Sequence, residues 1–261
     1  MRIAIYQVDA FTDRVFGGNP AAVCPLDAWL TDTAMQAIAQ ENNLSETAFF
    51  VADGEDYALR WFTPMVEVDL CGHATLASAW VIFDRLEHRR QAVRFHTRSG
   101  VLTVRRDGPD LAMDLPANPP GTAGMIAGLA EALGDRPAEL LETRDHYLAV
   151  FDSAARVRAL DPDFGRLAAL DRWAVIVTAP GDGDVDFVSR FFAPRKGVPE
   201  DPVTGSAHCV LTPFWSSRLG RETLAARQVS RRGGALTCRL QGDRVELAGR
   251  VAPYMQGTIE I

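Results

Sequence analysis

The sequence predicts an α/β protein of the α+β type, made of two similar domains in which many strands surround one apolar helix. Cys71-Gly72-His73-Ala74 opens an apolar run, and Thr204-Gly205-Ser206-Ala207 opens a second one. The stretch 60–64 (RWFTP) returns as 190–194 (RFFAP), and 98–103 (RSGVLT) returns as 232–237 (RGGALT). The offsets are 130 from 60 to 190, 133 from 72 to 205, and 134 from 98 to 232. Similar stretches in the same order at nearly constant offset indicate an internal duplication.

The domain boundaries follow from the length of the chain and from this offset. At 261 residues the chain has room for two domains of ordinary size. We expect the first repeat at 1–116 and the second at 117–261, because the proline-rich stretch 116–121 is typical of a linker. One option stays open, namely that the last strand returns to the first domain.

The first half is expected to begin with a strand over 1–8, where polarity alternates. Gly17-Gly18-Asn19-Pro20 predicts a turn, since glycine and asparagine tolerate positive φ. Thr31 or Asp32 can cap a helix that Asn42-Asn43 ends. The run 72–86 is apolar on nearly every side, which predicts a buried helix. Further strands are expected at 21–24, 45–51, 57–62, 93–95, 101–105 and 111–115.

The second half follows the same scheme of many strands and one central helix. We expect a helix at 126–133 and the matched apolar helix at 205–219. The strands expected here are 147–151, 173–178, 187–192, 228–230, 235–240, 244–247 and 257–261. No GxGxxG follows the first strand and no P-loop occurs, so no nucleotide cofactor is expected.

Composition and charge exclude several classes of function. A formal net charge of −7 leaves no basic stripe for phosphates, so no nucleic-acid partner is expected. No apolar run reaches the length of a membrane span, and the first residues lack the features of a signal peptide, so no membrane partner is expected. The four cysteines show neither CxxC pairing nor zinc spacing. We therefore expect no metal site and the reduced thiols of a cytoplasmic protein.

The two helix starts are candidate binding sites. Gly72 and Gly205 let other groups approach the backbone closely. The first N–H groups of a helix lack partners within the helix and can bind an anion such as a carboxylate. Two such starts would bind a small carboxylate substrate. The alternative is that both glycines serve helix–sheet packing; their repetition favours the binding site.

Polar residues follow each glycine. His73 and Ser206 occupy the same place in the two repeats, 133 residues apart. A histidine in this position can donate a hydrogen bond to a substrate or transfer a proton, although a single histidine is more often structural. His208 lies two residues beyond Ser206, and we interpret it as structural.

Carboxylates supply the remaining candidates for chemistry. Asp69 and Asp201 precede the two helices and could cap them. Asp201 is followed by proline, which keeps the chain extended and can direct its carboxylate. Glu46 lies at the start of the apolar strand segment 48–51. Apolar surroundings disfavour a charged carboxylate, which makes Glu46 a candidate general acid/base. The alternative is a glutamate at a strand edge that faces water.

Five motifs span nearly the whole chain from residue 9 onwards. They are Gly17-Gly18-Asn19-Pro20, Asn43-Leu44-Ser45-Glu46-Thr47-Ala48-Phe49, Arg60-Trp61-Phe62-Thr63-Pro64, Asp69-Leu70-Cys71-Gly72-His73-Ala74-Thr75 and Glu200-Asp201-Pro202-Val203-Thr204-Gly205-Ser206-Ala207. In this order they resemble the PhzF-like phenazine-biosynthesis family. The resemblance implies the diaminopimelate-epimerase fold, in which two curved, mostly antiparallel sheets each wrap around a central helix. It also implies a cleft between the domains, a homodimer and no cofactor.

The resemblance further implies roles for individual residues. Glu46 corresponds to the catalytic acid/base, and three residues form its polar shell: His73, Asp201 and Ser206. Gly72 and Gly205 provide backbone contacts, and we add Ser45 and Thr204 as substrate-binding candidates. The best-known activity of the family isomerises 2,3-dihydro-3-hydroxyanthranilate. There the glutamate removes the C3 proton and returns a proton at C1 on the same face.

Two alternative functions remain open. Racemases and epimerases of this fold use two cysteines. Cys71 occupies the first position, but the repeat offset puts Thr204 in the second, and Cys209 lies a helical turn further on. This disfavours two-thiol racemisation and leaves a hydroxyproline-type dehydratase using Cys71 and Thr204. The chain could also be a small-molecule-binding protein without turnover.

Overall fold

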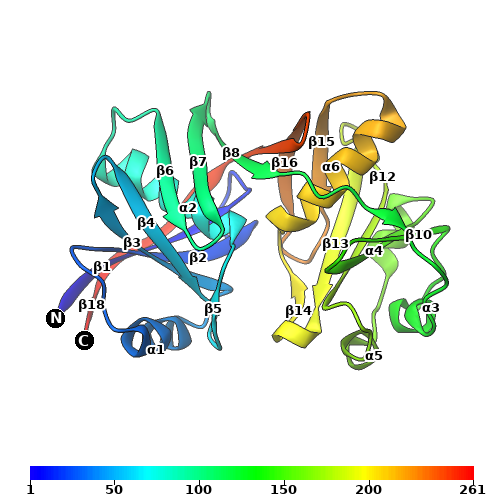
Figure 1. The fold of residues 1–261 in the computed structure, drawn as a ribbon, viewed down its shortest axis with the longest axis horizontal. Helices are drawn as coiled ribbons and strands as arrows, with labels where there is room; N and C mark the ends of the chain where they lie inside the picture. The colour runs from blue at the N-terminus through cyan, green and yellow to red at the C-terminus, as the bar shows by residue number, and fades with distance from the viewer. The chain divides into compact units, whose positions relative to one another are not determined.

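Two similar units make up the protein, and the computed structural model describes residues 1–261. Unit 1 comprises Met1–Leu115 and Glu246–Ile261, and unit 2 comprises Pro116–Val245. We expected the second repeat to extend over 117–261 with the return of the last strand as an option. In the structure 246–261 lies in unit 1, because β18 (Val251–Glu260) pairs antiparallel with β1 (Arg2–Ala10) along its length (Figure 1).

Unit 1 is a mainly antiparallel arrangement of strands with two helices. The order of pairing is β18–β1–β2–β3–β4–β6–β7–β8, and only β2–β3 and β4–β6 are parallel. The remaining elements are β2 (Asn19–Leu26), α1 (Asp32–Asn42), β3 (Glu46–Asp53), β4 (Asp56–Phe62), β5 (Glu67–Val68), α2 (Gly72–Val81), the π-helix η1 (Ile82–Leu86), β6 (Ala92–Thr97), β7 (Gly100–Asp107) and β8 (Asp110–Pro116). β17 (Arg244–Gly249) spans the boundary between the units along the chain.

Unit 2 repeats the strand order of unit 1. β11 and β12 are parallel like β2 and β3, β13 is antiparallel to β12, and β15 is parallel to β13 and antiparallel to β16. Its elements are β9 (Gly121–Thr122), α3 (Leu129–Leu133), β10 (Glu139–Glu142), β11 (His146–Val150), α4 (Ala154–Ala159), α5 (Phe164–Ala168), β12 (Ala174–Pro180), β13 (Phe187–Ala193), the 3-10 helix η2 (Pro194–Lys196), β14 (Val198–Asp201), α6 (Gly205–Leu219), β15 (Thr223–Gln228) and β16 (Gly234–Gln241).

The duplication also extends to side chains. Arg60 on β4 binds Glu67 through two hydrogen bonds of 2.7 Å, and Arg190 on β13 binds Glu200 through bonds of 2.7 and 3.0 Å. Each arginine also lies over a phenylalanine two residues further along its strand. In both units this bidentate pair joins the long strand to the short strand that leads into the central helix. The predicted fold class of two similar α+β units is confirmed.

The central helices are buried as the sequence predicts. In α2 all residues from His73 to Val81 except Trp80 are buried, and the helix packs against β1, β2, β3, β7 and β18. Strands from both ends of the pairing order contact one helix, so the sheet of unit 1 curves around it. In unit 2 the ring of Trp215 on α6 stacks on Phe187, and its indole N–H donates to Thr178 on β12 at 3.0 Å.

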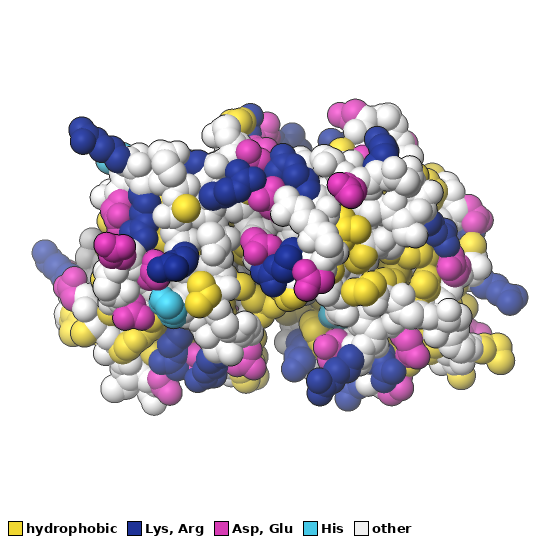
Figure 2. Space-filling model, turned by 45° about the horizontal axis from the view of Figure 1, so that its top comes forward, with side chains coloured by type: hydrophobic (Ala, Val, Ile, Leu, Met, Phe, Trp, Pro, Cys, Tyr) yellow, Lys and Arg dark blue, Asp and Glu magenta, His cyan; other side chains and the backbone are white.

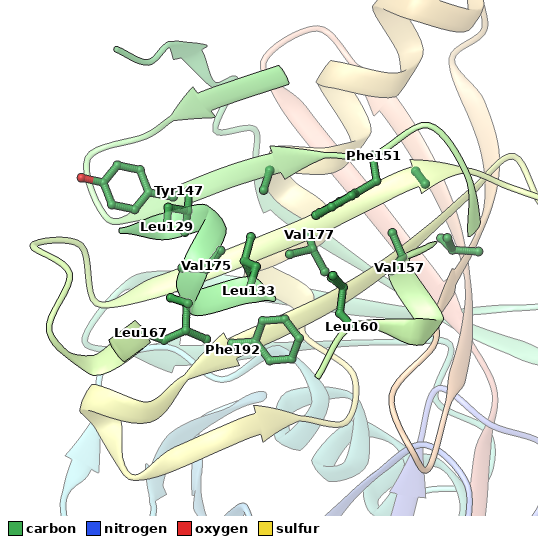
Figure 3. Packing of buried hydrophobic residues seen from close by; sticks show 14 of the residues in the cluster. Leu129, Leu133, Tyr147, Phe151, Val157, Leu160, Leu167, Val175, Val177 and Phe192 are labelled. Atoms are coloured by element: carbon green, nitrogen blue, oxygen red, sulfur yellow. The ribbon is translucent and has the colours of Figure 1, made fainter. Parts of the chain in front are cut away.

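A second layer covers the outer face of the sheet in unit 2. Helices α3, α4 and α5 place their apolar side chains against β11, β12 and β13, as Figure 3 shows. Leu133, Val157 and Leu167 come from the helices and meet Val177 and Phe192 from the strands. The helix that we expected at 126–133 is the shorter α3 in the structure. The sequence did not predict α4 and α5.

No helix is both long and apolar enough to cross a bilayer. On the face that Figure 2 shows, acidic and basic side chains are intermixed. Many of them are paired with each other, as Arg158 is with Asp182 at 2.7 Å.

Candidate functional site

In unit 1, one group of predicted site residues lies at the start of α2. Glu46 is the first residue of β3 and pairs with Ala21 on β2, two residues beyond Asn19. His73 is the second residue of α2. The turn before β2 depends on Gly18, which has φ +60° and lies so close to Ala10 O that an added Cβ would be 2.1 Å from it. The glycine therefore allows the chain to turn tightly and to place Asn19 at the start of β2.

The contacts within this group centre on His73. Its Nε2 lies 3.1 Å from Glu46 Oε2, at ion-pair distance but out of hydrogen-bond alignment. Its Nδ1 lies 3.1 Å from the amide nitrogen of Asn19 and 3.5 Å from Cys71 Sγ. The side chain of His73 is 6% exposed and that of Glu46 is 17% exposed. Glu46 is thus the member of the group that a small molecule could reach.

Burial and the neighbouring side chains shift the pKa of His73 in opposite directions. Burial alone would lower the pKa of His73, but its interactions with the Cys71 sulfur and the Glu46 carboxylate outweigh burial and hold this pKa well above the ordinary histidine value. Burial raises the pKa of the Cys71 thiol to about 11, and the charge of Glu46 adds to this. At neutral pH the group therefore contains a protonated thiol, which is a poor nucleophile and a poor base.

These three side chains are also the ones that could hold a metal ion. One ligand atom each from Glu46, Cys71 and His73 lies within 4.8 Å of the others. Zinc accepts thiolate, imidazole and carboxylate ligands. The imidazole Nδ1 also lies 3.1 Å from the side-chain amide nitrogen of Asn19. The same short distances suit the exchange of protons between these side chains.

In unit 2, the second group of predicted site residues lies at the start of α6. Asp201 ends β14, and Thr204 is the residue that precedes the helix. The Thr204 hydroxyl donates a short hydrogen bond to the Asp201 carboxylate. The buried side chain of Gln228, at the end of β15, accepts from Thr204 N at 2.9 Å and donates to Asp201 O at 2.7 Å. Ser206 lies half-buried in the first turn of the helix.

The two helix starts share a feature that bears on ligand binding. Neither Cys71 nor Thr204, the N-cap residues of α2 and α6, caps its helix through a side-chain hydrogen bond. Asp201, which we considered as a cap, accepts from Thr204 instead. Helix starts without such a cap keep N–H groups and the positive end of the helix dipole available for an anion.

His208 has the structural environment that we expected. It is fully buried, and its Nδ1 lies 2.8 Å from Thr204 O in the first turn of α6. Burial lowers its pKa to about 4, so the neutral ring donates Nδ1–H to this carbonyl. Thr75, 133 residues earlier, makes the corresponding bond to Cys71 O at 2.6 Å. Both side chains thus bond back to the residue before the helix.

The predicted site residues therefore form one group in each unit. Glu46, Gly72 and His73 meet in unit 1, with Ser45 half-buried beside them. The members of the group in unit 2 are Asp201, Thr204, Gly205 and Ser206. Sequence reasoning missed the roles of two buried amides. Asn19 was quoted only as part of a turn motif, and Gln228 only as one end of a strand. No spacing rule identifies Gln228, because its partners belong to another element.

Comparison with known proteins finds a family model, relatives and solved structures that match nearly the whole chain. The family model described as "Phenazine biosynthesis-like protein" matches residues 8–257. A relative from Pseudomonas aeruginosa, named an uncharacterized isomerase, is 56% identical over the whole of both chains. The crystal structure of a PhzF-family protein from Enterococcus faecalis has a TM-score of 0.97 and 46% identity, with 100% of each chain covered. A hydroxyproline epimerase from Agrobacterium vitis, with a TM-score of 0.63, 10% identity and coverage of 99% and 92%, shares the fold alone.

Proposed function

Because the chain belongs to the phenazine biosynthesis-like (PhzF) family and is an isomerase, we propose that it isomerises a small carboxylate substrate by proton transfer through Glu46, without a cofactor. The single observation that carries the proposal is the Glu46–His73 pair at 3.1 Å. A buried imidazole at this distance can stabilise the negative charge of a carboxylate, and an ionised carboxylate is the form that removes a proton.

Glu46 acts in this proposal as the only acid/base. It removes a proton from a carbon next to a carbonyl or an unsaturated group, holds it as a carboxylic acid, and returns a proton to another carbon on the same face. No net proton is gained or lost. His73 stays beside Glu46 and stabilises its charge before removal and after return.

The substrate carboxylate is assigned to the uncapped start of α6 and to the residues around it. The N–H groups there can donate to a carboxylate, and Asp201 and Ser206 are suited to bind hydroxyl or amino substituents. The first substrate to test is 2,3-dihydro-3-hydroxyanthranilate, the compound that the motif resemblance implies. Homodimer formation and a cytoplasmic location stay predictions.

Deuterium exchange tests the acid/base assignment. Candidate carboxylates are incubated with the protein in heavy water, and deuterium at carbon is measured by NMR. We expect exchange in the wild type and a loss of about 10²-fold or more in Glu46→Gln, which keeps the size of the side chain but removes the base. Glu41→Gln, at an exposed position on α1, is the control and should keep the wild-type rate. Exchange by Glu46→Gln at the wild-type rate would contradict the assignment.

Substitution of Cys71 distinguishes this proposal from the alternatives in which a thiol is the catalytic group. A racemase or dehydratase that used Cys71 would lose its activity in Cys71→Ala. We expect this variant to keep most of its exchange activity, because the thiol is protonated and buried. If no carboxylate exchanges in the wild type, the binding-protein alternative is favoured.

A further inference from the structure

We infer that Gln228 is a positioning residue that keeps the Thr204 hydroxyl on Asp201 and away from the start of α6, and so keeps that helix start available for the substrate carboxylate. The inference rests on the proposed function for its consequence in catalysis. Its structural part, the direction of the Thr204 side chain, is independent of any activity.

One buried amide makes three hydrogen bonds to a single short segment. Gln228 is fully buried, and its Oε1 accepts from Thr204 N at 2.9 Å. Its Nε2 donates to Asp201 O at 2.7 Å and to Thr204 Oγ1 at 3.2 Å. The orientation of the amide is unambiguous, since an oxygen faces an N–H group and a nitrogen faces a carbonyl. Gln228 thus fixes both ends of the segment that leads into the helix.

These bonds set the direction of the Thr204 hydroxyl. Because Gln228 donates to Oγ1, the hydroxyl proton must be given to another acceptor, and it is given to Asp201 Oδ2. Hydrogen bonds in such a chain strengthen each other. The result is an ordered path from Gln228 through Thr204 to the carboxylate of Asp201.

The consequence lies at the helix start. A threonine at the N-cap normally accepts from the N–H group of the second or third residue of the helix. Here those residues are Ser206 and Ala207, yet Thr204 makes no such bond. Its oxygen is occupied by Gln228 and Asp201 instead. A side chain of the protein therefore does not compete with a bound carboxylate for these N–H groups.

A substitution that keeps the shape of the side chain tests the structural part. Gln228→Met has a similar length but makes none of the three hydrogen bonds. In its crystal structure we expect Thr204 Oγ1 to have turned to the N–H of Ser206 or Ala207. If Thr204 still donates to Asp201 and leaves the helix uncapped, the inference is wrong. Substrate kinetics of this variant should show a rise in KM of about tenfold with a smaller change in kcat.

A second variant provides a test by pH. In Gln228→Glu the protonated side chain can still donate to Asp201 O or Thr204, whereas the ionised side chain cannot. Two titratable residues belong to the segments that Gln228 and Thr204 contact, namely Asp201 on β14 and His208 on α6. We expect KM to approach the wild-type value at low pH and to rise as the new carboxyl group ionises. Where Gln228→Met does not fold, this profile decides alone.

Gln36→Glu is the matched control, because Gln36 on α1 also donates to a backbone carbonyl, Thr63 O, at 2.8 Å. Its KM profile should follow that of the wild type. A wild-type profile in Gln228→Glu would overturn the inference. The two proposals fail separately: full exchange in Glu46→Gln refutes the acid/base role, whereas an unmoved Thr204 in Gln228→Met refutes the role of Gln228.

Discussion

His73 and His208 show how the same side chain acquires opposite properties at corresponding helix starts. Both are buried, but His73 lies next to a carboxylate and His208 next to a backbone carbonyl. Interactions with Cys71 and Glu46 outweigh the burial of His73 and raise its pKa, whereas burial lowers the pKa of His208 to about 4. The sequence indicated a polar role for His73 and a structural one for His208, but not these pKa shifts, because they depend on burial and on contacts made only in the folded chain.

The two histidines predict opposite dependences of stability on pH. The raised pKa of His73 gives stability that is fully present below the unfolded value of about 6.5 and is lost as pH rises through the folded value. The lowered pKa of His208 gives stability that is lost as pH falls from about 6.5 towards about 4. Urea unfolding across pH should show that His73→Gln removes part of the alkaline decline and His208→Gln part of the acid decline. A wild-type curve shape in His73→Gln would contradict the first assignment.

At the scale of elements, glycine patterns and apolar runs predicted the two central helices and the strands around them. Their ends were less predictable, since α2 passes into the π-helix η1 at Ile82 and the helices α4 and α5 are too short for a clear periodicity. The turn at Gly17-Gly18-Asn19-Pro20 was predicted from its residue types. Its importance for the site comes from packing, because it places Asn19 beside His73.

Substitution of Gly18 tests how strictly this turn is determined. Gly18→Ala introduces a Cβ at a left-handed position and 2.1 Å from Ala10 O, so the backbone must shift. We expect a loss of more than about 2 kcal/mol in the free energy of unfolding. Gly54→Ala is the matched control, because Gly54 has a similar φ of +63° with nothing within 4 Å. Equal losses in the two variants, measured by chemical denaturation, would show that the close approach to Ala10 is unimportant.

At the scale of the whole molecule, the repeat offset predicted two similar units. It did not determine that the residues from 246 onwards belong to unit 1. The local pattern could not show this, since β18 is exposed over most of its length and lacks the alternation of a half-buried strand. Its partner β1 lies at the other end of the chain, and pairing between such distant segments leaves no trace in local sequence.

Removal of the C-terminal segment should therefore affect one unit selectively. A chain that ends at Val245 lacks β18, so β1 loses its antiparallel partner over Arg2–Ala10 and the cluster that contains Ile3 and Ile5 loses Ile259. We expect unit 1 to unfold or to become protease-sensitive, whereas unit 2 keeps its own core of helices α3 to α5 on β11 to β13. Limited proteolysis with mass spectrometry should then leave a protected fragment from about residue 116 onwards. A chain that ends at Glu260 is the control and should resist proteolysis like the wild type. Equal protection of both units in the chain that ends at Val245 would show that unit 1 does not depend on β18.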